Sequence, residues 1–211
     1  MLKTKTIEFD NEMKALSQGV YKGNEKYIPK DWIKVEEYES KGGFHGEAFF
    51  KNGTVVIAMR GTELNDINDL GNDGAMARKK LPNQYVDAQE FYARVRKDFP
   101  GRKIVFTGHS LGGSLSQLMA NKTGCEAVTF NAYGTADILK WTYGDDLNIR
   151  NYGHIKDPIF NANLGNQLGH TFIIDNEDDT NFFTNCSKED VLCCLEQSIE
   201  KYDNNKIKIQ S

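Results

Sequence analysis

Residues 103–113 read Lys-Ile-Val-Phe-Thr-Gly-His-Ser-Leu-Gly-Gly, and this stretch decides the fold. It holds the pattern Gly-x-Ser-x-Gly as Gly108, Ser110 and Gly112, directly after the apolar run at residues 104–106. A serine on a tight strand-to-helix turn has its hydroxyl pushed out of the backbone, as a nucleophile requires. The helix after the turn is predicted from apolar residues three and four positions apart, which are Leu111, Leu115, Leu118 and Met119.

A phosphate-binding loop is the competing interpretation of a glycine-rich turn between a strand and a helix. Such a loop needs a lysine before a serine or threonine at the start of the helix. Gly113 stands at the lysine position, before Ser114, so we set this interpretation aside. The turn therefore predicts a nucleophilic serine at position 110.

Length and composition bound the remaining possibilities. The chain has 211 residues, of which 39% are hydrophobic and 27% charged, as is ordinary for one globular α/β domain. A net charge of −4 without a concentrated basic patch argues against nucleic acid as a partner. The sequence contains no run of 18 apolar residues, and its first ten residues lack the apolar core of a secretory signal. We expect a cytoplasmic protein, or one exported without a classical signal peptide.

Strands and helices are expected to alternate along most of the chain. Asn-Gly at positions 52 and 53, between two β-rich runs, is a strong hairpin signal. Alternation of this kind predicts a mainly parallel central sheet with helices on both faces. With the Gly-x-Ser-x-Gly turn, this arrangement resembles the α/β-hydrolase type. No convincing linker divides the chain, so we expect a single domain over residues 1–211. The expected strands are 44–50, 54–59, 104–106, 127–130, 147–152 and 171–174, and the expected helices are 11–21, 85–99, 111–119, 136–141 and an amphipathic 188–202.

Residues 62–84 form a long polar stretch that we predict to be irregular, with room for one short helix. A connection of this length in a compact domain is more often functional than idle. The segment carries scattered apolar residues, so it is a candidate lid or acyl-chain wall, and an ordinary surface loop is the equal alternative.

Four cysteines, at positions 125, 186, 193 and 194, match the spacing of no metal site. Cys193 and Cys194 are adjacent in a helix-like stretch, where a mutual disulfide would be strained. We expect free thiols, and neither a metal nor a cofactor.

A nucleophilic serine needs a histidine as base and a carboxylate that orients that histidine. In α/β-hydrolases the chain order is serine, acid, histidine, which excludes His45, and a structural role is expected for His109 beside the serine. His154 and His170 remain, and His170 follows Asp157 by thirteen residues. We favour Asp157 as acid and His170 as base. Asp137 is the reserve acid and His154 the reserve base.

The oxyanion of the tetrahedral intermediate needs two donors. One is the amide of Leu111, because the residue after the nucleophile starts a helix. The other is expected from the loop after the apolar strand 55–59, where Thr62 offers both an amide and a hydroxyl.

These residues together resemble the class 3 lipase family, the α/β-hydrolases that include the fungal triacylglycerol lipases. The resemblance covers about residues 45–175. The matching pieces are residues 55–62 ending in Arg-Gly-Thr, Gly-His-Ser-Leu-Gly-Gly at 108–113, Ala-Val-Thr-Phe at 127–130 and Asp-Pro-Ile at 157–159. It implies Ser110 as nucleophile, Asp157 as acid, His170 as base, and Thr62 with Leu111 as oxyanion hole. The chain departs from the family at 131–134, where Asn-Ala-Tyr-Gly replaces Pro-Arg, and in the short segment between acid and histidine.

The expected activity is that of a serine ester hydrolase of the lipase or phospholipase type, which cleaves acyl esters of lipids through an acyl-enzyme. Its partner would be a lipid or other acyl ester, with transient contact to a membrane surface. The oligomeric state does not follow from the sequence. Two rivals stay open: a carboxylesterase for small substrates, and a binding protein on the same fold without catalytic activity.

Overall fold

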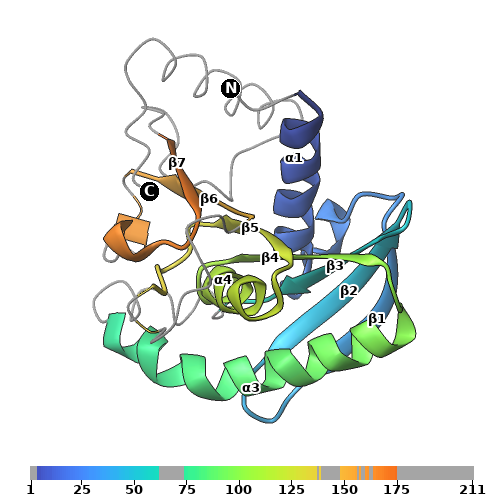
Figure 1. Ribbon diagram of the computed structural model, residues 1–211, viewed down its shortest axis with the longest axis horizontal. Helices are drawn as coiled ribbons and strands as arrows, with labels where there is room; N and C mark the ends of the chain where they lie inside the picture. The colour runs from blue at the N-terminus through green and yellow to red at the C-terminus, as the bar shows by residue number, and fades with distance from the viewer. Residues whose placement is uncertain are drawn as a thin grey trace.

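A seven-stranded sheet forms the centre of the protein in the computed structural model (Figure 1). The structure describes residues 4–61, 74–136, 138, 148–155, 157, 160–161 and 164–174. The strands lie side by side in the order of the sequence. They are β1 (Ile33–Glu39), β2 (His45–Lys51), β3 (Thr54–Met59), β4 (Lys103–His109), β5 (Glu126–Phe130), β6 (Ile149–His154) and β7 (His170–Ile174).

Strand β2 is antiparallel to both of its neighbours, β1 and β3, whereas β3 to β7 are parallel. This mixed sheet confirms the predicted, mainly parallel α/β architecture. The carboxyl ends of β3 to β7 therefore meet at one edge of the sheet. We call this edge, which follows Met59, His109, Phe130, His154 and Ile174, the carboxyl edge.

Helices cover both faces, as predicted. One face is covered by α1 (Thr4–Gly19), and the other by α3 (Gly74–Asp98) and α4 (Leu111–Thr123) (Figure 1). Alternate residues of β3 point to opposite faces. Ile57 lies in the cluster with α3 and α4, and Val56 in the cluster with α1. Two single turns of 3-10 helix, η1 (Glu25–Tyr27) and η2 (Leu164–Asn166), complete the described elements.

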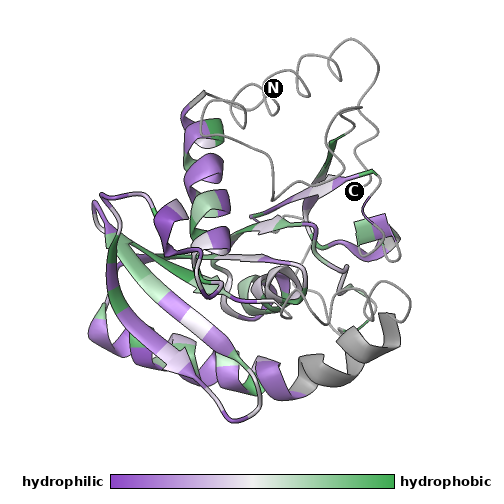
Figure 2. Ribbon diagram, turned by 180° about the vertical axis from the view of Figure 1, so that it is seen from behind, coloured by the Kyte–Doolittle hydropathy of each residue, from purple (hydrophilic) through white to green (hydrophobic). Residues whose placement is uncertain are grey.

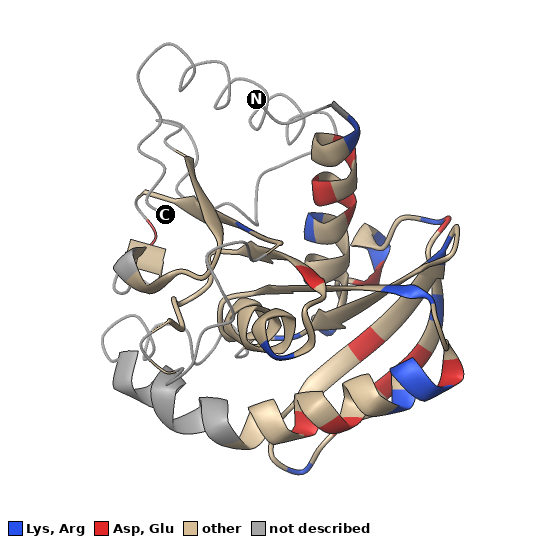
Figure 3. Cartoon of the chain, viewed as in Figure 1, with Lys and Arg blue, Asp and Glu red and all other residues tan. Residues whose placement is uncertain are grey.

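Hydropathy and charge follow this layering. Hydrophilic residues dominate the described part of α3, whereas β3 is hydrophobic (Figure 2). Acidic and basic residues are interspersed on α1, α3 and the β1–β2 pair (Figure 3). In α4 the only charged residue is Lys122 in the last turn, because residues 111–121 are all buried. None of the described helices is long and apolar enough to cross a membrane.

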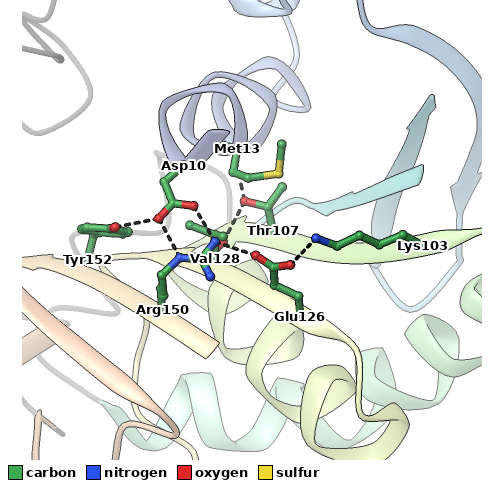
Figure 4. A network of polar contacts seen from close by, with 8 residues as sticks. All are labelled: Asp10, Met13, Lys103, Thr107, Glu126, Val128, Arg150 and Tyr152. Atoms are coloured by element: carbon green, nitrogen blue, oxygen red, sulfur yellow. Dashed lines mark hydrogen bonds and ion pairs between the residues drawn. The ribbon is translucent and has the colours of Figure 1, made fainter. Parts of the chain in front are cut away.

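A buried polar network fastens α1 to the sheet (Figure 4). The Asp10 carboxylate accepts two hydrogen bonds from the Arg150 guanidinium, at 2.7 and 2.6 Å, and one from the Tyr152 hydroxyl at 2.7 Å. Arg150 also donates to Glu126 at 2.6 Å, and Lys103 pairs with the second oxygen of Glu126 at 2.6 Å. Every charge in this network thus faces an opposite one, which is the condition for burying charges at all.

The structure differs from the sequence-based expectation in three elements. The first helix begins at Thr4, well before residue 11. Strand β1 was not predicted. Helix α3 starts at Gly74 and runs through Pro82, so the irregular connection predicted for 62–84 is wrong from residue 74 onward, while 62–73 lie outside the described residues.

Other predicted features agree with the structure or concern residues outside the described part of the chain. The hairpin is present, with Asn52 and Gly53 at φ of 50° and 82° in its turn. Cys125 is a free thiol, and the other three cysteines lie outside the described residues. The helices predicted for 188–202 and for most of 136–141 also lie outside them; Ala136 and Ile138 lie in a turn.

Candidate active site

Ser110 occupies a sharp turn between β4 and α4, at the carboxyl edge. Its φ of 54° and ψ of −123° lie in a region that residues other than glycine rarely adopt. Its amide donates to Phe130 O at 3.0 Å, and its carbonyl accepts from Ser114 N at 3.1 Å. The strained turn is therefore anchored to β5 on one side and to the first turn of α4 on the other. Only 2% of Ser110 is exposed, so its hydroxyl lies in a largely water-free setting.

The two motif glycines allow α4 to begin against the end of the sheet. A Cβ on Gly112 would lie 2.0 Å from the Met59 carbonyl oxygen, and one on Gly108 would lie 2.4 Å from the Gly112 carbonyl carbon. Both obstacles are backbone atoms, which cannot move aside as a side chain could. The pattern Gly-x-Ser-x-Gly is thus a requirement of close backbone packing here.

The loop that leaves β3 passes directly beside the serine. A Cβ on Gly61 would lie 3.3 Å from Ser110 Cβ and 2.6 Å from His109 O. This places the start of the predicted oxyanion loop in contact with the nucleophile, although Thr62 itself lies outside the described residues. Leu111 is the first residue of α4, so its amide belongs to the helical turn that has no acceptor within the helix.

Tyr21, from the turn after α1, joins this loop to the nucleophile strand. Its hydroxyl accepts from Gly61 N at 3.0 Å and lies 3.2 Å from His109 Nδ1. Burial, with a smaller effect of the Lys14 charge, lowers the pKa of His109 to about 3, so this ring is neutral near pH 7. His109 is thereby held in a structural contact, as expected.

Asp157 follows β6 at the same edge and is held by two donors. Its Oδ1 accepts from Phe160 N at 2.9 Å, and its Oδ2 accepts from Asn131 Nδ2 at 3.1 Å. Asn131 in turn accepts the amide of His154 on its Oδ1 at 2.9 Å. Ser110, Asn131, His154 and Asp157 therefore follow three neighbouring strands, β4, β5 and β6, at one edge.

His170 is not brought to this edge. It opens β7 and pairs with Arg150, near the start of β6, whereas His154 pairs with Ile174 at the far end of both strands. The four residue steps from Arg150 to His154 span about 13 Å. The prediction that His170 is the base therefore conflicts with the fold, because the first residue of a parallel strand lies opposite the carboxyl edge. The reserve base His154 does lie at the edge, and the reserve acid Asp137 is outside the described residues.

Comparison with known proteins identifies the family. Residues 12–140, more than half of the chain, match the family described as phospholipase-like, Tle-like phospholipase domain. This chain belongs to that family. The Tle-like phospholipase domain shares 37% identity over 90 residues with an ATG15 protein of Eremothecium gossypii whose name classes it as a lipase. It shares 34% over 100 residues with an extracellular phospholipase A1 of Serratia liquefaciens.

These relatives are much longer than the matching part. The two alignments cover 39% and 47% of this chain, but only 16% and 30% of the respective relatives. The Tle-like phospholipase domain therefore corresponds to less than a third of either relative's length.

Solved structures of fungal lipases share the fold. A Rhizomucor miehei lipase in complex with its propeptide superimposes with a TM-score of 0.62 at 17% identity, covering 84% of this chain and 71% of that one. A lipase from Rhizopus microsporus var. chinensis gives a TM-score of 0.58 at 15% identity, covering 82% and 76%. The expected α/β-hydrolase fold of the class 3 lipase type is thus confirmed.

A second polar group lies on β1 and β2 of the Tle-like phospholipase domain. Ligand atoms of Glu37, His45 and Glu47 lie within 4.8 Å of one another. The Lys34 ammonium lies 2.7 Å from Glu37 Oε2 and 3.4 Å from Glu47 Oε1, so a cation of the chain itself already stands between the carboxylates. We interpret this group as an ion-pair network on the edge of the sheet.

Sequence reasoning missed the roles of Tyr21 and Asn131. Tyr21 is 88 residues from His109, and no local pattern connects the two. Asn131 carried one signal, since asparagine tolerates the left-handed backbone that its φ of 44° requires.

Proposed function

We propose that this domain hydrolyses acyl esters of lipids, with Ser110 as the nucleophile. The observation that carries the proposal is the strained, buried turn at Ser110, with a helix amino-terminus on one side and the Gly61 loop on the other. A strained serine between a strand and a helix is the geometry of a nucleophile elbow. The names of the relatives, a phospholipase A1 and a lipase, support an ester of a lipid as substrate.

The reaction follows from the groups around the turn. Ser110 Oγ attacks the ester carbonyl carbon while a histidine takes the hydroxyl proton, and the oxyanion forms beside the Leu111 amide and the loop at Gly61 and Thr62. The histidine then gives its proton to the departing alcohol, leaving an acyl-enzyme. Water, deprotonated by the same histidine, hydrolyses the acyl-enzyme and releases the fatty acid.

Asp157 is proposed as the acid because its carboxylate is fixed at the carboxyl edge. Among the described histidines that follow Ser110, His154 is proposed as the base in place of His170, because it ends β6 at this edge. With Asp157 as the acid, this assignment reverses the usual order of acid and histidine along the chain. Contact with a lipid surface is part of the proposal, since long-chain esters reside in lipid aggregates. A cytoplasmic location, or export without a classical signal peptide, also stays a proposal.

Labelling by a fluorophosphonate probe tests the nucleophile. We expect the probe to label the wild-type protein and to leave Ser110→Ala unlabelled. Equal labelling of both proteins would refute the enzyme hypothesis and favour a binding protein. His154→Ala is expected to abolish turnover, and His170→Ala to retain it. If His170→Ala alone abolishes turnover, our revision of the base is wrong. If neither does, the base lies outside these two residues.

Chain length of the substrate separates the lipase from its nearer rival. We expect phospholipid vesicles and long-chain esters to be hydrolysed faster than acetate or butyrate esters. A preference for short esters would favour the small-substrate carboxylesterase.

A further inference from the structure

We infer that Asn131 is a positioning residue that holds the acid Asp157 in place for the reaction. This inference rests on the proposed function, in which Asp157 is the acid. Asn131 directly follows β5, the strand that lies between the nucleophile strand β4 and the strand β6 that leads to Asp157. It is thus the residue of the carboxyl edge that stands between the two proposed reacting elements.

The hydrogen bonds of Asn131 fix the orientation of its amide without ambiguity. Its Oδ1 accepts from the His154 amide at 2.9 Å, and its Nδ2 donates to Asp157 Oδ2 at 3.1 Å. A backbone amide can only donate and a carboxylate can only accept, so the flipped amide would lose both bonds. Only 3% of Asn131 is exposed, so water does not compete for either contact.

The backbone of Asn131 is fixed as firmly as its side chain. Its amide donates to Tyr152 O at 2.8 Å, and the preceding carbonyl, of Phe130, accepts the amide of Ser110 at 3.0 Å. The nucleophile turn and Asn131 are therefore joined through one peptide unit. A shift of Asp157 relative to Ser110 would have to break one of these bonds or the bond from Asn131 Nδ2 to Asp157.

Asp157 needs this support because it lies beyond the end of β6, outside the ladder of the sheet. Its Oδ1 is engaged with Phe160 N, and its carbonyl accepts from Asn161 N at 3.0 Å. Asn131 donates to Oδ2, so the two carboxylate oxygens are held by different segments of the chain. A carboxylate that orients a histidine requires such a fixed direction.

Two substitutions separate this role from simple folding support. Asn131→Gly removes both side-chain bonds and tolerates the φ of 44°. Asn131→Asp keeps an acceptor for the His154 amide but replaces the donor with a carboxylate facing Asp157. Asn52→Gly is the matched control, because Asn52 is an exposed residue of the β2–β3 turn with a similar φ of 50°.

The readout is kcat and KM on a soluble ester, together with the rate of fluorophosphonate labelling and the melting temperature. We expect both Asn131 variants to lose about 10- to 100-fold in kcat with KM within about twofold of wild type, as for a small misplacement of a catalytic group. Asn52→Gly should match the wild type. If Asn131→Gly fails to fold, Asn131→Asp decides the question.

Three results would overturn the inference. Wild-type kcat in Asn131→Gly would do so, as would activity retained in Asn131→Asp but lost in Asn131→Gly, since the His154 bond would then be the important one. The third would be that Asn131→Gly slows labelling as much in an Asp157→Asn background as in the wild type. A residue that acts through Asp157 should slow labelling less than about threefold in that background. Failure of the wild type itself to label would instead refute the proposed function.

Discussion

Removing the Asp10 carboxylate should destabilise the fold strongly, because Asp10 is the anion that fastens α1 to β6. Asp10 is fully buried and receives the Arg150 guanidinium in a two-bond contact and the Tyr152 hydroxyl in a third. In Asp10→Ala, Arg150 keeps only Glu126 as a carboxylate partner, and Tyr152 loses its acceptor. The positive charge of the buried Arg150 guanidinium is then balanced by one carboxylate in place of two.

The magnitude follows from these contacts. Breaking one side of a buried ion pair costs about 3 to 5 kcal/mol, and the remaining Glu126 contact argues for about 3. An unpaired buried hydroxyl adds about 1 kcal/mol. A total of about 4 kcal/mol corresponds to a fall in Tm of roughly 8 to 16 °C for a domain of this size.

Thermal unfolding followed by circular dichroism measures this change. Glu90→Gln is the control, since the Glu90–Arg94 pair lies on one exposed helix face with side chains 52% and 45% exposed, and its Tm should equal that of the wild type. A fall of less than about 3 °C for Asp10→Ala would refute the reasoning, because the network would then contribute no more than a surface pair.

Three further predictions concern the site and the acid response. Tyr21→Phe should lower kcat about tenfold and leave the fold intact, because the buried Gly61 amide loses its acceptor beside the oxyanion loop. Steady-state kinetics on a soluble ester measures this fall, and an unchanged kcat would contradict the prediction. Gly112→Ala should abolish fluorophosphonate labelling, since its Cβ would overlap the Met59 carbonyl, and normal labelling would show that the turn can relax. Glu126→Gln should flatten the loss of stability in acid. Burial raises the pKa of Glu126, but hydrogen bonds from Lys103 and Arg150 outweigh it and bring the pKa below 4.5. A group with a lowered folded pKa stabilises above its unfolded value and loses that contribution as pH falls, so urea unfolding at pH 6 and pH 3 should differ less in the variant than in the wild type.

The parts of the fold with strong local signals were predictable from the sequence. The Gly-x-Ser-x-Gly turn and the Asn-Gly hairpin are set by backbone conformations that few residues allow, so the pattern and the structure coincide. Strands β3, β4 and β5 were found because they are buried along most of their length and carry apolar runs.

The elements that were missed lack such local signals. Strand β1 has the sequence Ile-Lys-Val-Glu-Glu-Tyr-Glu, and its charged residues hid a strand that lies at the edge of the sheet. Charged side chains are common on edge strands, where they discourage pairing with other chains. Helix α3 continues through Pro82, although proline usually ends a helix, so the local signal predicted the wrong structure there.

The choice of base illustrates a different limit. Chain order left both His154 and His170 as possible partners of Ser110, and the position of Asp157 upstream of His170 favoured His170. Chain order does not say at which edge of the sheet a residue lies. A residue that opens a parallel strand lies at the amino edge, and the crossover from Asp157 to β7 must return along the sheet before that strand can begin.

The edge of the sheet at which a residue lies is therefore a criterion that chain order does not supply. Ser110, Asn131 and His154 come from three consecutive strands, and each directly follows or ends its strand at the carboxyl edge. Side chains on β4 and β6 are separated by one intervening strand, roughly 10 Å across two strand spacings. The residues at the end of β5 lie between them: the Phe130 carbonyl accepts the Ser110 amide, and the Asn131 side chain accepts from His154 N and donates to Asp157. The asparagine that departs from the lipase pattern at position 131 is consequently the residue whose substitution best tests whether this edge is the active site.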